Sequence, residues 1–466
     1  MKSTGYRNTR NRTVPSSQAP EGLASRRAAL KVIRDVTEKG AYASLSLDSE
    51  LRGAGLNASD RHLASRLVYD TLDRLPYLDM ALNQLMARED TDIRLRNILR
   101  LGACQILLED RIPESAATNT CVYLCSELGM EGLKGVCNGI LRNLIRKKDQ
   151  LVFPDPETEP DEAAVIRFGI PKWLWMRLRE DWGQETAEKI AGYRGTDTGI
   201  TIRPNLTRIS DVEFETLLNK KVWGHQRLDI PHAWRITGAM DIGEDADFRS
   251  GQFSIQSESS MLAVMAMDPA RGRQYLDCCA APGGKTCYMS ELMNGTGRIL
   301  AWDVHPHRVS LIDAQRKRLG LENIRPVVRD ALSFRSDLEK TMDGVLLDAP
   351  CTGTGMMSEK PDIKLHCDES SLTQLSAIQA RLLDSVCMYV KEGGTLVYST
   401  CSVLKSENED QISSFLSRHP EFYIADLPDS VPEKYRVNYR IGVQLFPFRD
   451  NVEGFYICRM KRKSMI

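Results

Sequence analysis

The sequence lacks an excess of charge of either sign. Its 466 residues contain 62 Lys and Arg against 63 Asp and Glu, for a formal net charge of -1 at pH 7. Overall charge therefore does not indicate a nucleic-acid partner, and any basic surface must be local. The sequence also lacks an apolar run near the ~20 residues of a membrane span, and its first residues contain no signal-peptide core. We therefore expect a cytoplasmic protein that binds no membrane.

The pattern of a disulfide framework or a metal site is missing as well. The 12 cysteines are scattered through a long, charged chain, which favours reduced thiols. Cys121 and Cys125 stand one helical turn apart, but no second pair or histidine is near them. His305 and His307 follow a strand-like run and are typical of a loop. We expect no metal site, and we expect a monomer.

Composition and length describe an ordinary globular protein of several domains. With 42% hydrophobic and 27% charged residues, the chain can bury sizeable cores, and its length suggests about three domains. The divisions that we predict are a disordered tail over residues 1–21, a helical domain over 22–150, a linker over 151–163, a small α+β subdomain over 164–250 and a larger α/β domain over 251–466.

Residues 25–148 show helical periodicity throughout. Ala29, Ile33 and Val36 repeat at helical spacing, Gly40 ends that helix, and Ser59 suits the cap of a later one. The pattern predicts an all-helical bundle. Its last helix carries a basic cluster, which is typical of a solvated face and could also contact RNA. The cluster consists of Arg142, Arg146, Lys147 and Lys148.

A linker and a small mixed region follow. Residues 153–162 contain three prolines among acidic residues, a composition that disfavours a helix or a central strand and indicates a linker. Residues 201–205 are expected to be extended and residues 212–218 helical. This alternation predicts a small α+β subdomain.

From residue 251 onwards, strand-like runs alternate with helical patterns. This order predicts a Rossmann-like, doubly wound and mostly parallel sheet, whose ligands bind at the carboxyl ends of the strands. Most of the runs end in an acidic residue at that edge. They are residues 275–277, 299–303, 327–330, 345–348 and 395–399.

The loop after the first of these strands, residues 277–286, is typical of a ligand cradle. Gly283 and Gly284 permit close approach of the backbone, and the next helix directs free N–H groups at an anionic ligand. An ordinary turn would look similar. The loop lacks G-x-G-x-x-G, which disfavours a dehydrogenase, whereas acidic strand ends at positions 277, 303, 330 and 348 favour an adenosyl ligand.

Two thiols follow the fourth and fifth strands, which are neighbours in a doubly wound sheet. Cys351 and Cys401 should therefore lie at one rim beside the loop. Carbon 5 of a pyrimidine attacks a methyl donor only after a thiolate has added to carbon 6. Asp348 is placed to stabilise charge at N3 if it holds or shares a proton. An amino-group methyltransferase needs no thiol, and Cys351 disfavours it.

Two parts of the sequence resemble known families. The helical domain resembles the NusB-type RNA-binding domain, on residues 61–70, 99–103, 112–117 and 138–142. Residues from about 165 to 460 resemble the RNA cytosine-C5 methyltransferases of the NOL1/NOP2/Sun family. That resemblance rests on residues 279–285, 348–355, 361–364, 400–402, 407–409 and 454–456, together with Asp303, Arg308 and Asp330.

The second resemblance implies S-adenosyl-L-methionine as cofactor and a cytosine of small-subunit ribosomal RNA as substrate. Cys401 would be the nucleophile, Cys351 would assist proton removal and release, and Asp348 would lie between cofactor and base. The residues alone do not rank the two thiols. The implied cofactor-binding residues are Cys279, Ala280, Ala281, Pro282, Gly283, Gly284, Lys285, Asp303 with Arg308 for the ribose, Asp330 for the adenine, and Asp348.

Two other functions stay open at this point. The chain could be an RNA-binding ribosome-assembly factor whose second domain only binds, although retention of both thiols and of Asp303 and Asp348 argues against this. It could also methylate carbon 5 of a cytosine in another RNA.

Overall fold

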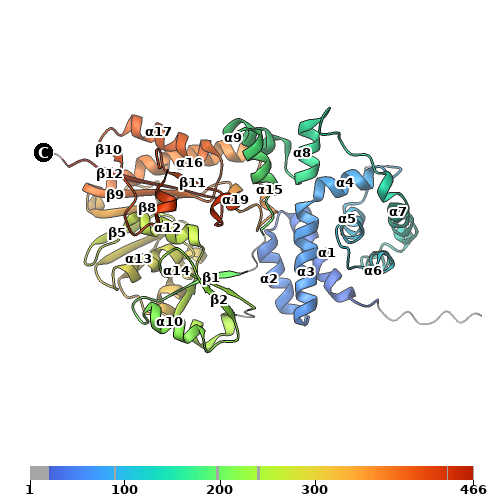
Figure 1. The fold of residues 1–466 in the computed structure, drawn as a ribbon, viewed down its shortest axis with the longest axis horizontal. Helices are drawn as coiled ribbons and strands as arrows, with labels where there is room; N and C mark the ends of the chain where they lie inside the picture. Colours follow the sequence, from blue (N-terminus) through green and yellow to red (C-terminus); the bar gives the residue numbers. More distant parts are fainter. Residues whose placement is uncertain (1–19, 89–90, 196–198, 239–241, 438, 465–466) are drawn as a thin grey trace, which may run out of the picture. The chain divides into compact units, whose positions relative to one another are not determined.

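The computed structural model describes residues 20–88, 91–195, 199–238, 242–437 and 439–464. The chain divides into two compact units, Met1–Glu159 and Pro160–Ile466 (Figure 1). The predicted tail, residues 1–21, lies outside the described residues except for Pro20 and Glu21. The division falls inside the predicted linker, and the remaining domain boundaries stay predictions.

The first unit is helical, as predicted, and its apolar stripes form one core. Cys121 and Cys125 are fully buried in that core together with Cys104 and Cys137. Its helices are α1 (Leu23–Lys39), α2 (Ala43–Gly53), α3 (Ala58–Asp73), α4 (Leu75–Asn83), α5 (Ile93–Leu107), α6 (Glu114–Glu127) and α7 (Lys134–Lys147), with 3-10 turns at Glu131–Leu133 and Lys148–Gln150.

One of the two predicted helix ends in this unit is confirmed and one is wrong. Gly40 ends α1 with a φ of 67°, and its N–H donates to Val36 O at 3.1 Å. Ser59 does not cap α3. Asn57 does, because the chain is already helical at Ala58 and Asn57 Oδ1 accepts from Asp60 N at 2.9 Å.

The second unit begins with two helices. The first, α8 (Pro160–Phe168), starts within the predicted linker, because proline is tolerated in the first helical turn, where its missing N–H would have no partner. Asp161 and Glu162, in the first turn, stabilise the helix because their negative charges lie at the positive end of its dipole. The next helix, α9 (Lys172–Gly192), is broken at Gly183, whose φ is 76°.

A small antiparallel sheet follows, with the strand order β2-β3-β1-β4. Its strands pack with α10 (Asp211–Leu218) around Phe214 and Trp234. The extended segment and the helix predicted here correspond to β1 and α10, and β4 continues the sheet past residue 250. The strands are β1 (Ile200–Pro204), β2 (Gly224–Arg227), β3 (Trp234–Thr237) and β4 (Phe253–Ile255), and a 3-10 turn (Ile242–Glu244) and α11 (Ala246–Arg249) lie before β4.

The large sheet has the order β10-β12-β9-β8-β5-β6-β7, and β11 pairs with β12. The pairs from β9 to β7 are parallel and the others antiparallel, which confirms the predicted doubly wound fold. The strands are β5 (Gln274–Asp277), β6 (Arg298–Asp303), β7 (Ile324–Val328), β8 (Met342–Asp348), β9 (Val390–Thr400), β10 (Phe422–Ile424), β11 (Val443–Leu445) and β12 (Phe455–Arg462).

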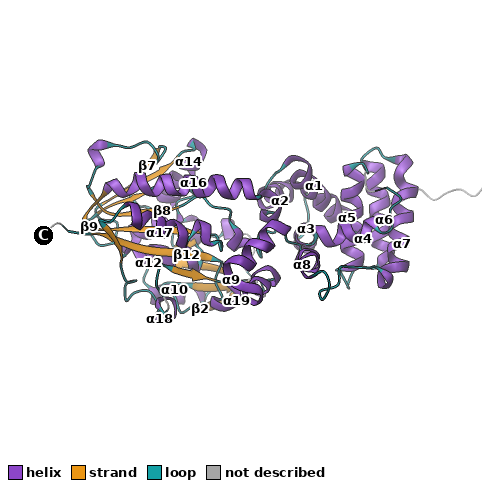
Figure 2. Cartoon of the chain, turned by 90° about the horizontal axis from the view of Figure 1, so that it is seen from above, coloured by secondary structure: helices purple, strands orange, loops and turns teal. Residues whose placement is uncertain are grey.

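Helices cover both faces of this sheet, because neighbouring residues of each strand point to opposite sides. Tyr275 packs into one core and Leu276 into the other. In Figure 1, α16 and α17 lie on one side of the strands and α12, α13 and α14 on the other; Figure 2 shows these helices and strands from above, coloured by secondary structure. The helices are α12 (Glu258–Met267), α13 (Gly284–Leu292), α14 (Pro306–Leu319), α15 (Ile363–His366), α16 (Glu369–Val386), α17 (Glu409–Arg418), α18 (Glu433–Arg436) and α19 (Pro447–Asp450).

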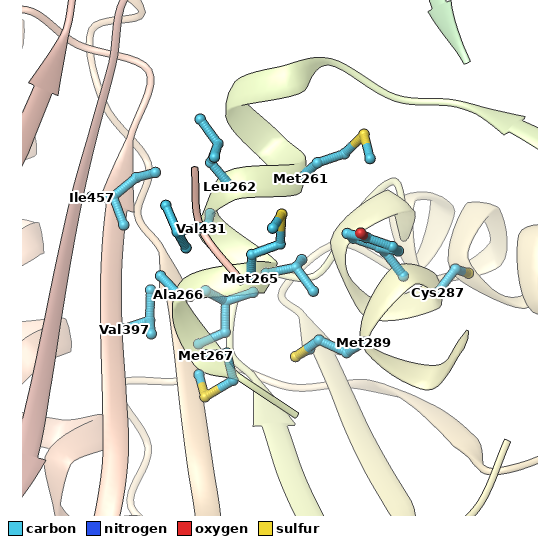
Figure 3. Packing of buried hydrophobic residues seen from close by; sticks show 14 of the residues in the cluster. Met261, Leu262, Met265, Ala266, Met267, Cys287, Met289, Val397, Val431 and Ile457 are labelled. Atoms are coloured by element: carbon cyan, nitrogen blue, oxygen red, sulfur yellow. The ribbon is translucent and has the colours of Figure 1, made fainter. Parts of the chain in front are cut away.

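Helix α12 is apolar on nearly all sides and lies inside the unit. Figure 3 shows Met265 and its neighbours between Val397 and Ile457 on the strands and Met289 on α13. A helix that is buried all round has no solvated face, so its position is set by packing alone. This packing places the residues just before α12 beside the loop that follows β5.

The order of the strands identifies where a ligand would bind. The chain runs outward from β5 through β6 to β7, and then returns to place β8 on the other side of β5. Open α/β sheets bind ligands at such a reversal, beyond the carboxyl ends of the two strands. Here those ends are Asp277 and Asp348.

Candidate active site

The loop between β5 and α13 holds a buried carboxyl group. Asp277 ends β5 and is 1% exposed. Thr286 Oγ1 donates to Asp277 Oδ2 at 2.6 Å, whereas Oδ1 has no partner among the described residues. Burial raises the pKa of Asp277 to about 7. A buried carboxylate with an unpartnered oxygen favours a ligand that brings a positively charged donor.

A cavity of about 210 Å³ lies against this loop. Asp277 and Asp348 border it, and Gln256 and Ser257 contribute its opposite wall from the segment before α12. The predicted cofactor residues that line it are Cys279, Ala280, Ala281, Pro282, Gly284, Lys285 and Asp348.

Four predicted cofactor residues do not line that cavity. Gly283 supports the loop from behind: its φ is 107°, and a Cβ there would lie 3.2 Å from the backbone of Ile312. Asp303 ends β6 and is 3% exposed; Arg308 Nη1 lies 3.4 Å from its Oδ2. Arg308 Nη2 also donates to Ala281 O at 3.2 Å, which ties Asp303 to the loop. Asp330 is exposed beyond β7.

Gln256 also lines the cavity, although no pattern in the sequence indicates a role for it. It is 7% exposed, and its Oε1 accepts from Arg203 Nε at 2.5 Å. That bond turns the amide so that Nε2 is left without a partner among the described residues. Arg203 is itself held by an ion pair with Glu291, and both are fully buried. No sequence motif marks Gln256, because its partner lies 53 residues away on β1.

An ion pair joins the loop to the end of β8. Lys285 Nζ donates to Asp348 Oδ2 at 2.7 Å, and Ser399 Oγ donates to Asp348 Oδ1 at 2.7 Å. Burial acts to lower the pKa of Lys285, but the charge of Asp348 and its hydrogen bond outweigh burial, so the pKa is raised. Lys285 therefore supplies a fixed positive charge beside Asp348, which the sequence analysis did not anticipate.

The two predicted thiols meet, as expected from the pairing of β8 with β9. Asp348 and Ser399 are register partners in these parallel strands, and Cys351 and Cys401 lie three and two positions after them, respectively. The two sulfur atoms lie 3.3 Å apart. The hydrogen bond from the Cys351 thiol lowers the pKa of Cys401, and the ammonium of Lys285 acts in the same direction. The same bond, together with burial, raises the pKa of Cys351.

A glycine pair fixes the loops that carry these thiols. Gly355 N donates to Cys401 O at 2.9 Å, and Gly454 N donates to Gly355 O at 3.1 Å. A Cβ on Gly355 would lie 1.9 Å from Gly454 O, so no larger residue fits without moving the backbone. The thiol separation therefore depends on residues from three distant segments.

Residues 20–464, apart from their short gaps, contain no group of three His, Cys, Asp or Glu side chains arranged to hold a metal ion. Within the same residues, no helix combines the length and the apolar composition that crossing a membrane requires.

Family models match both units. Residues 23–146 match the model of the NusB family, and residues 264–461 match the model described as 16S rRNA methyltransferase RsmB/F. Among solved structures, that of PH0851 is similar with a TM-score of 0.81 and 26% identity, covering 94% of this chain and 99% of the other. A methyltransferase homologue from Pyrococcus horikoshii has a TM-score of 0.57 and 28% identity, covering 66% of this chain and 99% of its own.

Curated relatives match along nearly the whole sequence. A probable ribosomal RNA small subunit methyltransferase B from Bacillus subtilis is 32% identical over 441 residues, which cover 94% of this chain and 98% of the relative. A ribosomal RNA small subunit methyltransferase B from Erwinia tasmaniensis is 31% identical, covering 93% of this chain and 98% of its own. The chain therefore belongs to the family of the ribosomal RNA small subunit methyltransferases B.

Proposed function

We propose that this chain transfers a methyl group from S-adenosyl-L-methionine to carbon 5 of a cytosine in small-subunit ribosomal RNA. The observation that carries the proposal is the pair of thiols 3.3 Å apart at the ends of β8 and β9, beside a cavity whose lining suits the amino-acid part of the cofactor. A methyl transfer to an amino group would need no thiol there.

The donors and acceptors of the cavity fit the amino-acid part of the cofactor. Asp277 Oδ1 is a buried acceptor without a partner and suits the α-amino group; Gln256 Nε2 is a buried donor without a partner and suits the α-carboxylate. The start of α13 adds free backbone N–H groups on the side of the carboxylate. Asp303 would hold the ribose hydroxyls with Arg308 behind it, and Asp330 the adenine amino group. When bound, the cofactor supplies an electrophilic methyl group.

The thiols and the ion pair then perform the chemistry on the base. The sulfur of Cys401 bonds to carbon 6 of the cytosine, and negative charge accumulates towards N3 and carbon 5. The Lys285 ammonium donates to Asp348 Oδ2, so this pair brings a positively charged donor that can stabilise the charge at N3. The C5 proton must leave as the sulfur–carbon bond breaks. Cys351 serves both events: its S–H hydrogen passes to the departing Cys401 sulfur while its own sulfur takes up the C5 proton, so both thiols end protonated.

The first unit would contribute contacts to the RNA. The basic residues Arg142, Arg146 and Lys147 of α7 and Lys148 of the 3-10 turn after it are exposed, and Lys148 pairs with Glu114 at 3.0 Å. Exposed Arg and Lys contact phosphates without reading the sequence. The target cytosine must leave any stack to reach Cys401, so we propose an unpaired or loosely held base.

Label transfer tests this function. Methyl-labelled S-adenosyl-L-methionine and small-subunit ribosomal RNA are incubated with the protein, and the RNA is digested to nucleosides. We expect the label in 5-methylcytidine. Label in N4-methylcytidine would assign an amino-group methyltransferase. RNA binding with no transfer to free RNA or to subunit particles would favour an assembly factor.

Gln256 provides a test of the cofactor site that needs no RNA. In Gln256→Glu the side chain can still accept from Arg203 but can no longer donate into the cavity. Loss of a hydrogen bond to a charged group, about 1.5–3 kcal/mol, corresponds to weaker binding of S-adenosylhomocysteine by about 10- to 100-fold. Methylthioadenosine lacks the amino-acid carboxylate, so its affinity should stay unchanged.

Calorimetric titration of both ligands measures this selectivity. Gln226→Glu, on exposed β2, makes the same substitution away from the cavity and serves as the control. Equal weakening of both ligands by Gln256→Glu would contradict the role of Gln256 at the carboxylate. Failure of the unmodified protein to bind S-adenosylhomocysteine would contradict the assignment of the cofactor itself.

A further inference from the structure

A carboxylate without a cation is buried beside the Cys351 loop. Glu407 ends a 3-10 turn (Lys405–Glu407) that follows β9, and its side chain is fully buried. Its Oε1 accepts from Thr352 N at 2.9 Å and from Gln379 Nε2 at 3.0 Å, and its Oε2 accepts from Thr352 Oγ1 at 2.5 Å. Within the described part of the chain, no salt bridge reaches Glu407.

The hydrogen bonds alone do not require a charge at this position. A glutamine could accept from Thr352 N and from Gln379 through Oε1, and could donate from Nε2 to Thr352 Oγ1, because a hydroxyl accepts as well as donates. A buried charge without a counterion is costly, so a neutral side chain would be the more stable choice. Glutamine would therefore support the loop as well as glutamate does, and the negative charge of Glu407 must have a different effect.

The negative charge of Glu407 acts on Cys351, the neighbour of its hydrogen-bond partner Thr352. Thr352 directly follows Cys351, and Gln379 Nε2 also donates to Pro350 O at 2.9 Å, so Glu407 and Gln379 hold the Cys351 loop from both sides. The negative charge of Glu407 opposes ionisation of Cys351 and adds to the rise of its pKa.

Three charged groups face the thiol pair, one from each neighbouring element. They are Asp348 at the end of β8, Lys285 at the start of α13 and Glu407 after β9. The Lys285 ammonium lowers the pKa of Cys401, whereas the charges of Asp348 and Glu407 raise it. Glu407 also raises the pKa of Cys351, and its hydrogen bond from Thr352 N holds the carboxylate beside the residue that follows this thiol. The charges around the Cys351 sulfur therefore differ from those around the Cys401 sulfur.

We propose that Glu407 decides which of the two thiols is ionised. Its buried negative charge keeps the proton on Cys351, so that Cys401 carries the thiolate. Glu407 is then a positioning residue that acts through Cys351 and touches neither cofactor nor base. The inference rests on the proposed function, since it explains why Cys401 and not Cys351 attacks the base.

Glu407→Gln tests the charge while keeping each of these hydrogen bonds possible. The free protein is treated with iodoacetamide from below to above neutral pH, and the rate of labelling of Cys351 and of Cys401 is followed by mass spectrometry. In the unmodified protein we expect Cys401 to react first. In Glu407→Gln we expect the ratio of the Cys401 rate to the Cys351 rate to fall by about tenfold, because one pKa unit changes the thiolate fraction tenfold.

Two control variants separate the effect of the negative charge of Glu407 from the effect of its hydrogen bonds to the Cys351 loop. Glu407→Asp keeps the charge and loosens the loop, so its labelling ratio should stay close to that of the unmodified protein even where thermal unfolding shows lower stability. Glu409→Gln removes the charge of a nearby, more exposed carboxylate that pairs with Lys405 at 3.1 Å, and should change nothing.

An unchanged ratio in Glu407→Gln, or an equal fall in Glu407→Asp, would overturn the inference. The labelling uses neither cofactor nor RNA. A failure of methyl transfer in the unmodified protein would therefore contradict the proposed function and leave the assignment of the charge intact.

Discussion

Replacing Cys401 with alanine is expected to abolish methyl transfer, lowering the rate by about 10³-fold or more, since loss of a catalytic nucleophile removes a whole reaction path. Carbon 5 cannot reach the reactivity it needs without the bond from sulfur to carbon 6. The variant should still bind S-adenosylhomocysteine with unchanged affinity, because Cys401 does not line the cavity beside the β5 loop. The label-transfer assay measures the first effect, and calorimetric titration measures the second.

A matched substitution shows whether the loss is specific to this thiol. Cys367, just before α16, is also half-buried, and it accepts a hydrogen bond from Ser371 of that helix. Cys367→Ala should keep full activity. Full activity in Cys401→Ala, with loss in Cys351→Ala, would reverse the roles of the two thiols, and full activity in both would exclude a thiol mechanism.

The general placement of this site could be predicted from the sequence, because it depends on local patterns. Strands that end in Asp277, Asp303 and Asp348 can be recognised from short apolar runs, and the doubly wound topology brings their ends to one edge. The pairing of β8 with β9 then brings Cys351 and Cys401 together. Each of these steps needs only the order of elements along the chain.

The contacts that tune the site could not be predicted in this way, because they join residues far apart in sequence. Lys285 meets Asp348 across 63 positions, and Arg203 meets Gln256 across 53. Glu407 meets Thr352 across 55 positions, through a carboxylate buried without a cation. Neither composition nor hydrophobic periodicity indicates which distant residues form such pairs.

Local rules also failed where two neighbouring residues could serve equally well. Asn57 and Ser59 are both good caps, and the chain starts α3 at the earlier one. Pro160 marked a break in the sequence, yet it begins α8, since proline interrupts a helix only beyond its first turn. These differences shift the first residues of two helices and leave the candidate active site unchanged.

Replacing Cys351 with alanine is expected to trap the RNA on the protein. The first bond, from Cys401 to carbon 6, needs only the Cys401 thiolate, so it should still form. Breaking that bond returns negative charge to the Cys401 sulfur, and in the unmodified protein the Cys351 sulfur lies 3.3 Å away, so its S–H can stabilise that charge. Without this donor, release should slow by about 10²-fold or more, the range typical of a lost proton-transfer group.

The trapped species can be detected without an activity assay. Cys351→Ala incubated with RNA and S-adenosyl-L-methionine should migrate in a denaturing gel as a protein–RNA adduct, which nuclease digestion removes. The double variant that also lacks Cys401 should form none. Because Cys351 also donates to Cys401 before the reaction, its loss raises the pKa of Cys401, and adduct formation should shift towards higher pH. Rapid turnover without an adduct would show that Cys351 has no part in release, and would leave Lys285 as the main group that stabilises the departing thiolate.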